Sequence, residues 1–182
     1  MSRFGKDDWM KVGYAALKSS VPDAMTLDGL CGRAQKTKGS FYHHFSSVPD
    51  FIKSLLDDWE TTATQAVTAD VEKSSRGLRG LQLLQQITSE LDVQTEKAVR
   101  SLAERSQDAL GHIQRVDAQR IAFLERLHQS LPGATRQRAA LLARVEYATF
   151  VGLMYIDQDA IGEDRNKLYN LFLDTIVTGA KR

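Results

Sequence analysis

The sequence has only one cysteine and no pattern typical of β-strands. Its single cysteine, Cys31, excludes an intrachain disulfide framework and a cysteine-rich zinc module. Only three prolines are present, and they fall at expected helix boundaries. No segment alternates apolar and polar residues between paired turn signals, as half-exposed strands do. We therefore expect an all-α protein.

The chain also lacks an excess of charge of either sign. Its 24 lysines and arginines face 23 acidic residues, for a net charge of +1. So small a charge gives no general attraction to nucleic acid, and any DNA-binding surface must be a local patch. The first residues contain no apolar signal region, so we expect a cytoplasmic protein.

One apolar run, residues 139–156, is long enough to raise the question of a membrane helix. Arg144 and Glu146 stand near its middle, and each such charge costs about 2.5–3.5 kcal/mol at the centre of a bilayer. We therefore interpret this run as a helix that protein buries on several sides, and we expect no membrane partner.

Apolar periodicity and capping residues predict about nine helices and no strands. Thr26, Thr37 and Ser47 are the clearest N-cap candidates, and Pro49 with Asp50 strengthens the last of them. The expected ranges are 6–20, 26–32, 37–45, 47–74, 78–93, 95–106, 108–131, 135–157 and 163–180.

The most informative unit is residues 26–45, in which two short helices follow each other closely. In a helix-turn-helix the first helix packs across the second, and the second enters the major groove of DNA. Such a unit needs apolar residues where the helices touch and polar or basic residues on its outer face. From Arg33 to His44 there are three basic residues, two histidines and no acid, so the positive patch is local. The inner faces can be built by Leu27, Leu30, Cys31, Phe41 and Phe45.

The run Thr37-Lys-Gly-Ser-Phe-Tyr-His-His-Phe45 resembles the recognition-helix signature of the TetR family of transcriptional regulators. Trp9–Leu17 resembles the first helix of that family, Thr26–Gly32 the second, and Ser47–Trp59 the start of its long connecting helix. The remainder of the chain is similar in layout only. The resemblance implies a helix-turn-helix DNA-binding domain over 1–46. Over 47–182 it implies a helical ligand-binding and dimerisation bundle, which begins with the connecting helix 47–74.

The resemblance also assigns roles to single residues. Thr26 and Thr37 would bind phosphate at helix starts, where backbone N–H groups favour anions. Lys38 would contact base edges, with Ser40 and His43 as partners. The other members would lie against the DNA backbone. The full DNA-binding set is Thr26, Lys36, Thr37, Lys38, Gly39, Ser40, Tyr42, His43, His44 and Lys53.

The chain departs from the family pattern in two places. Gln35-Lys36 stands where the family usually has Gly-Val in the turn between the helices. A residue other than glycine in a left-handed conformation costs about 1–2 kcal/mol, which predicts a turn of different conformation, with Lys36 adding a phosphate contact. Val48 stands in place of a phosphate-binding lysine, and Lys53 on the next turn is expected to substitute for it in part.

Within the ligand-binding and dimerisation bundle that the resemblance implies, the apolar helix faces indicate which residues would form the pocket and the dimer interface. A mostly apolar or aromatic small molecule is the default for such a pocket, and no cofactor is expected. The candidate pocket residues are Leu83, Ile87, Phe123, Leu127, Tyr147, Phe150 and Met154. The candidate dimer residues are Leu141, Val145, Gly152, Leu168, Leu171, Phe172, Thr175 and Ile176.

Together these features predict a homodimeric repressor that a small-molecule effector releases from an operator on double-stranded DNA. A helix-turn-helix protein that no longer senses a ligand is one alternative, and a helical-bundle enzyme is another. No Glu-x-x-His pair, phosphate-binding glycine loop or nucleophile motif favours an enzyme. His43 and His44 cannot share a metal ion, because adjacent helical positions point in different directions. Cys31 is expected to be inert packing.

Overall fold

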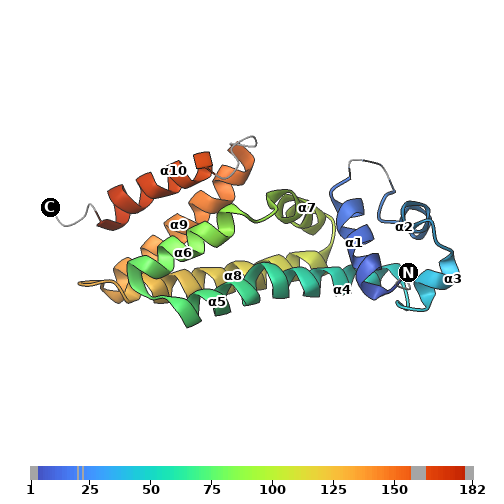
Figure 1. Cartoon of the computed structure of the whole chain (residues 1–182), viewed down its shortest axis with the longest axis horizontal. Coiled ribbons are helices and arrows are strands. Elements are labelled where there is room, and N and C mark those ends of the chain that lie inside the picture. Colours follow the sequence, from blue (N-terminus) through green and yellow to red (C-terminus); the bar gives the residue numbers. More distant parts are fainter. Residues whose placement is uncertain (1–3, 20, 22, 157–162, 179–182) are drawn as a thin grey trace. The chain divides into compact units, whose positions relative to one another are not determined.

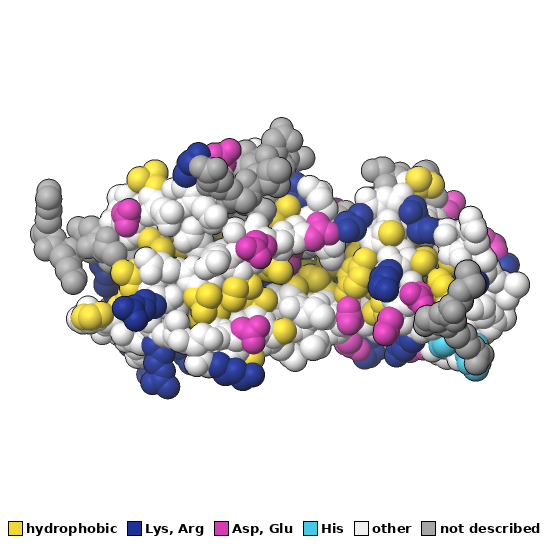
Figure 2. All heavy atoms as spheres, viewed as in Figure 1, with side chains coloured by type: hydrophobic (Ala, Val, Ile, Leu, Met, Phe, Trp, Pro, Cys, Tyr) yellow, Lys and Arg dark blue, Asp and Glu magenta, His cyan; other side chains and the backbone are white. Residues whose placement is uncertain are grey.

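A computed structural model describes residues 4–19, 21, 23–156 and 163–178 of the chain. These residues form helices and no strands, so the all-α prediction is confirmed (Figure 1). If helices that continue directly into each other are counted once, the described residues form nine, which is the expected number. Charged side chains of both signs are mixed on the face drawn in Figure 2, in keeping with the balanced composition.

The chain forms two compact units. Unit 1 comprises residues 1–60 and 92–113, and unit 2 comprises residues 61–91 and 114–182. The domain boundary expected after residue 46 coincides with neither limit. The helix that begins at Val48 contributes Phe51 to the core of unit 1, so its first half belongs to that unit.

Unit 1 contains α1 (Lys6–Leu17), α2 (Leu27–Ala34), α3 (Lys38–Tyr42), α4 (Val48–Glu60), α7 (Val93–Ala103) and the first residues of α8 (Gln107–Gln129). The predicted N-caps are confirmed. The hydroxyl oxygens of Thr26, Thr37 and Ser47 each accept the backbone N–H three residues later, at 3.2, 3.2 and 3.1 Å. These helices therefore begin where a short hydroxyl side chain satisfies a backbone donor.

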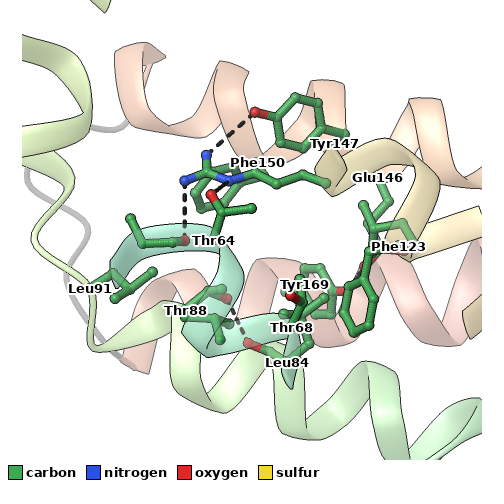
Figure 3. A pocket seen from close by; sticks show the side chains of 14 residues that line it. Thr64, Thr68, Leu84, Thr88, Leu91, Phe123, Glu146, Tyr147, Phe150 and Tyr169 are labelled. Carbon is green, nitrogen blue, oxygen red and sulfur yellow. Dashed lines mark hydrogen bonds between the residues drawn. The ribbon is translucent and has the colours of Figure 1, made fainter. Parts of the chain in front are cut away.

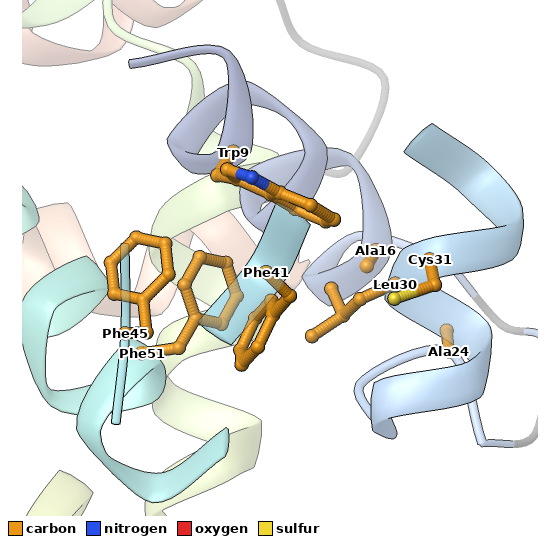
Figure 4. Close-up of a cluster of buried hydrophobic side chains, with 8 residues drawn as sticks. All are labelled: Trp9, Ala16, Ala24, Leu30, Cys31, Phe41, Phe45 and Phe51. Atoms are coloured by element: carbon orange, nitrogen blue, oxygen red, sulfur yellow. The ribbon is translucent and has the colours of Figure 1, made fainter. Parts of the chain in front are cut away.

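An aromatic cluster forms the centre of unit 1 (Figure 4). The ring of Phe41 lies 5.3 Å from Trp9, 5.4 Å from Phe45 and 5.5 Å from Phe51, measured between centroids. Most of these pairs meet edge to face, the arrangement that aromatic quadrupoles favour. The other members of the cluster are Ala16, Ala24, Leu30 and Cys31.

The turn between α2 and α3 is left-handed at Gln35, with φ 51° and ψ 43°. The N–H of Gln35 donates to the carbonyl of Gly32 at 3.2 Å, and the N–H of Lys36 to that of Cys31 at 3.1 Å. These two bonds make a Schellman C-cap. The expectation of a different conformation at Gln35-Lys36 is therefore wrong. Gln35 adopts the left-handed conformation although it is not a glycine, so its side chain introduces steric strain there.

Unit 2 contains η1 (Thr61–Gln65), α5 (Ala66–Ser74), α6 (Gly77–Ser89), the rest of α8, α9 (Arg136–Ile156), α10 (Glu163–Phe172) and η2 (Leu173–Thr178). The segments η1 and η2 are π-helical, and η1 joins α4 to α5 without a break. The buried core of unit 2 consists of Val71, Leu81, Phe123, Leu124, Leu127, Ala143, Tyr147 and Leu173.

The described residues of the chain cover only one side of α9. Leu142, Ala143 and Tyr147 are buried, whereas Leu141 is 60% exposed and Val145 is 49% exposed. The expected burial of this helix on several sides is therefore not provided by the described part of the chain itself. Among the described helices, α9 alone is long and apolar enough to cross a membrane, by length and composition.

Candidate nucleic-acid interface and internal cavity

The two phenylalanines of the α3 segment direct its polar face outward. Phe41 is fully buried and Phe45 is 2% exposed, so the opposite side of the helix must point away from the core of unit 1. Histidine side chains reach the surface of unit 1, as Figure 2 shows. The exposed predicted residues are Lys36, Thr37, Lys38, Gly39, Tyr42 and His43, and the half-buried ones are Ser40 and His44.

Lys38, the predicted base-contacting residue, is paired with an acid from the preceding helix. Its Nζ lies 2.7 Å from Oδ1 of Asp28, and both side chains are mainly exposed. The hydrogen bond and the charge of Asp28 raise the pKa of Lys38, so the lysine stays protonated. The stretch from Arg33 to His44 has no acid in sequence, but the fold brings one to its central lysine.

Three other predicted DNA-binding side chains also have partners within unit 1. The Nζ of Lys36 lies 5.0 Å from the centroid of the Phe4 ring, and that of Lys53 lies 2.6 Å from Oδ2 of Asp57. The hydroxyl of Thr26 donates to a backbone carbonyl three residues earlier at 2.7 Å. All three residues are exposed. To contact DNA they would have to give up these surface interactions, which are weak.

Neither Cys31 nor the neighbouring pair His43-His44 shows the features of a reactive thiol or a metal site. The Cys31 thiol is 8% exposed, and burial raises its pKa, with Asp28 adding to the effect. A protonated, buried thiol is a poor nucleophile, which supports the inert-packing interpretation. Among the described residues, no group of three or more histidine, cysteine or acidic side chains could hold a metal ion.

Comparisons with protein-family models, with curated proteins and with solved structures find no match.

Unit 2 contains a partly open cavity of about 70 Å³, between η1, α5, α6, α8, α9 and α10 (Figure 3). Phe123, Tyr147 and Phe150, three of the predicted pocket residues, line it. The other four do not, because their side chains pack into or against the apolar interior instead of bordering the cavity. These four are Leu83, Ile87, Leu127 and Met154.

Polar residues that sequence reasoning missed line one part of the cavity around Arg120. Its guanidinium donates to Thr64 Oγ1 at 3.0 Å, to the Ala63 carbonyl at 3.3 Å and to the Tyr147 hydroxyl at 3.4 Å. Tyr147 in turn donates to Asp117 at 2.6 Å. The positive charge of Arg120 is thereby linked to a carboxylate through one hydroxyl.

A second missed group lies at another part of the lining. Glu146 is 2% exposed; its Oε2 is 2.5 Å from Nε2 of His128, and its Oε1 accepts the Tyr169 hydroxyl. Burial raises the pKa of Glu146, because desolvation disfavours the charged carboxylate, and the hydrogen bond and the coulombic attraction of His128 oppose this only in part. A usable signal was present in the sequence: an acid stands at a core position of α9, between Ala143 and Tyr147.

Most predicted dimer residues lie on exposed helix faces of unit 2. Leu141, Val145, Leu168 and Leu171 are exposed, and a methyl group added at Gly152 would meet no atom within 4 Å. Thr175 is exposed as well. Phe172 differs, because it packs against the internal core of unit 2. The side chain of Ile176 lies outside the described residues.

Proposed function

We propose that this protein is a TetR-like, sequence-specific DNA-binding regulator that acts as a homodimer and releases DNA when a small molecule occupies the cavity of unit 2. One observation carries the DNA-binding part of the proposal. A short helix, anchored from behind by two buried phenylalanines, carries an exposed lysine, threonine, tyrosine and histidine, and it follows a left-handed turn after another short helix. This is the geometry by which a helix-turn-helix offers side chains to a major groove.

The exposed face of α9 supports the homodimer. Its apolar side chains at Leu141 and Val145 recur at four-residue spacing, and Gly152 leaves room for a close neighbour. A helix with a buried face and a second apolar face is stable in water when another surface covers it. A second copy would also double the number of recognition helices, and two half-sites bind far more tightly than one.

The position of η1 supports ligand control. This π-helical segment contributes Ala63 and Thr64 to the cavity, and the same helix continues into α4, which is part of unit 1. Ligand pockets usually measure about 300–1,000 Å³, so a drug-sized ligand would have to widen the present cavity. Widening would displace η1 and, through the continuous helix, α4. A ligand that binds the widened state more tightly would shift the population away from the DNA-binding state.

The experiment is selection of double-stranded DNA from a random library with the purified full-length protein, followed by anisotropy titration of the enriched sequence. We expect a pseudo-palindromic site. Lys38→Ala should weaken binding by roughly tenfold or more per half-site and relax base preference at one position, because a lysine contact to guanine is lost. Lys167→Ala is the matched control, since Lys167 is also an exposed lysine paired with an aspartate.

Recovery of no enriched sequence, or unchanged affinity and preference in Lys38→Ala, would contradict the proposed reading surface. If DNA binds and no small molecule alters the affinity, the protein is instead a regulator without ligand sensing.

A further inference from the structure

The chemistry of the cavity around Glu146 points to a class of ligand. The carboxylate borders the cavity, is 2% exposed and accepts hydrogen bonds from only two described residues, His128 and Tyr169. A carboxyl group has more acceptor positions than these two bonds fill, so it can accept further donors. The rest of the lining that faces this group is largely apolar or aromatic, with Phe123 and Tyr169 beside Glu146 in Figure 3.

His128 contacts Glu146 through one ring nitrogen, since its Nε2 lies 2.5 Å from Oε2 of the carboxyl group. Its Nδ1 is buried and has no hydrogen-bond partner among the described residues. The ring therefore holds one carboxyl oxygen in position from a single edge, and the carboxyl group keeps acceptor positions that no described residue fills.

Arg120 belongs to a hydrogen-bond network that does not include Glu146. Its guanidinium donates to Thr64, to the Ala63 carbonyl and to Tyr147, which is bonded to Asp117. In Figure 3 the side chains of Thr64 and Tyr147, joined through the guanidinium by dashed lines, lie apart from Glu146 and Tyr169. Arg120 is therefore already linked to an acid, whereas the buried Glu146 has only His128 and Tyr169 as described partners.

We propose that the ligand of this cavity is a small organic cation, an amine with an apolar or aromatic body, whose ammonium group binds Glu146 among the aromatic side chains. This deepens the proposed ligand-responsive regulation and rests on it. An ammonium donates to the open lone pairs of Glu146, favours the ionised form of the carboxyl group that burial disfavours, and is attracted to the faces of neighbouring aromatic rings. The apolar body would occupy the remaining lining, where Leu84 and Phe150 lie.

The test compares three probes of equal size and different charge on the full-length protein without DNA. Benzylamine, benzyl alcohol and benzoate are titrated while protein NMR shifts or calorimetric heats are recorded. We expect benzylamine to bind at least about tenfold more tightly than the other two, since hydrogen bonds to a charged group are the stronger kind. Glu146→Gln should abolish that preference, because the amide carries no charge, although its single oxygen can accept only one of the two hydrogen bonds that Glu146 receives.

Glu72→Gln is the matched control, since Glu72 is an exposed acid of unit 2 that pairs with Arg126 outside this cavity. Equal binding of the three probes, a preference for benzoate, or an amine preference that survives Glu146→Gln would overturn the proposal. The probe series on the unaltered protein decides the matter even if Glu146→Gln fails to fold. Amine binding in a protein that binds no DNA, or whose DNA affinity the amine leaves unchanged, would instead count against the proposed regulation and leave the ligand class standing.

Discussion

Asp28 and Lys38 form an ion pair on the surface that would meet DNA. The acid belongs to α2 and the lysine begins α3, and their charged atoms are 2.7 Å apart. Exposed pairs of this kind contribute little to folding. In the proposed complex with DNA, a phosphate or a base would displace Asp28 at small cost, but the acid would remain near the DNA backbone and repel it. Asp28 would then weaken non-specific binding beside Lys38, the proposed base-contacting residue.

We predict that Asp28→Asn strengthens DNA binding by roughly two- to fivefold, most of all to unrelated sequences, because it removes a negative charge close to phosphates. The effect should shrink as salt is raised. Anisotropy titrations at several salt concentrations measure it, with Asp164→Asn as the control, since Asp164 is also the exposed partner of a lysine. Weaker binding by Asp28→Asn would show that the pair orients Lys38 for contact.

At the scale of elements, α2 depends on a glycine that sequence reasoning left without a role. A methyl group built at Gly29 would lie 2.3 Å from the carbonyl oxygen of Asp23 and 2.9 Å from that of Ala24. The same Asp23 carbonyl accepts both the N–H and the hydroxyl of Thr26, at 2.9 and 2.7 Å. The loop before α2 is therefore packed directly onto the helix that it caps.

Gly29→Ala is expected to destabilise unit 1 by about 1–3 kcal/mol, because a methyl group would force backbone atoms apart. Gly32→Ala is the matched control in the same helix, since nothing lies within 4 Å of a methyl group there. That control should be neutral or stabilising by up to about 1 kcal/mol through helix propensity. Urea unfolding followed by tryptophan fluorescence measures both, because the two tryptophans, Trp9 and Trp59, belong to unit 1. Equal stability of the two variants would contradict this account of the loop.

At the scale of the whole molecule, α9 has an apolar face that no described residue of the same chain covers. Leu141 and Val145 lie four residues apart on that face, and Leu168 and Leu171 are exposed on α10. An apolar face of this kind is consistent with the proposed pairing of two copies.

The double change Leu141→Glu with Val145→Glu is expected to yield monomers and to lower operator affinity by at least about tenfold. The reason is that a monomer carries one recognition helix, whereas the dimer carries two that are linked. Sedimentation equilibrium and anisotropy measure the two effects. Leu78→Glu serves as the control, because Leu78 is a partly exposed leucine of unit 2 on α6. A dimer that persists in the double variant would move the interface elsewhere on the molecule.

Much of the fold could be predicted from local signals. Thr26, Thr37 and Ser47 cap helices where expected, and Phe41 and Phe45 are buried as their spacing indicates. These features depend on hydrogen bonds and periodicities within a few residues of chain, which a sequence displays directly. The conformation of Gln35 was predicted wrongly, because the packing of the two short helices outweighs the modest cost of a left-handed residue.

The sequence by itself determined that the chain is helical, where most of its helices begin, and which short helix presents polar residues outward. Only the tertiary structure decided that Asp28 meets Lys38, that Arg120 joins Tyr147 to η1, and that Glu146 lies buried between His128 and Tyr169. The physical reason is one of distance along the chain. Capping and amphipathic periodicity act between near neighbours, whereas burial and charge pairing join residues from separate helices, and no local pattern states which of them will meet.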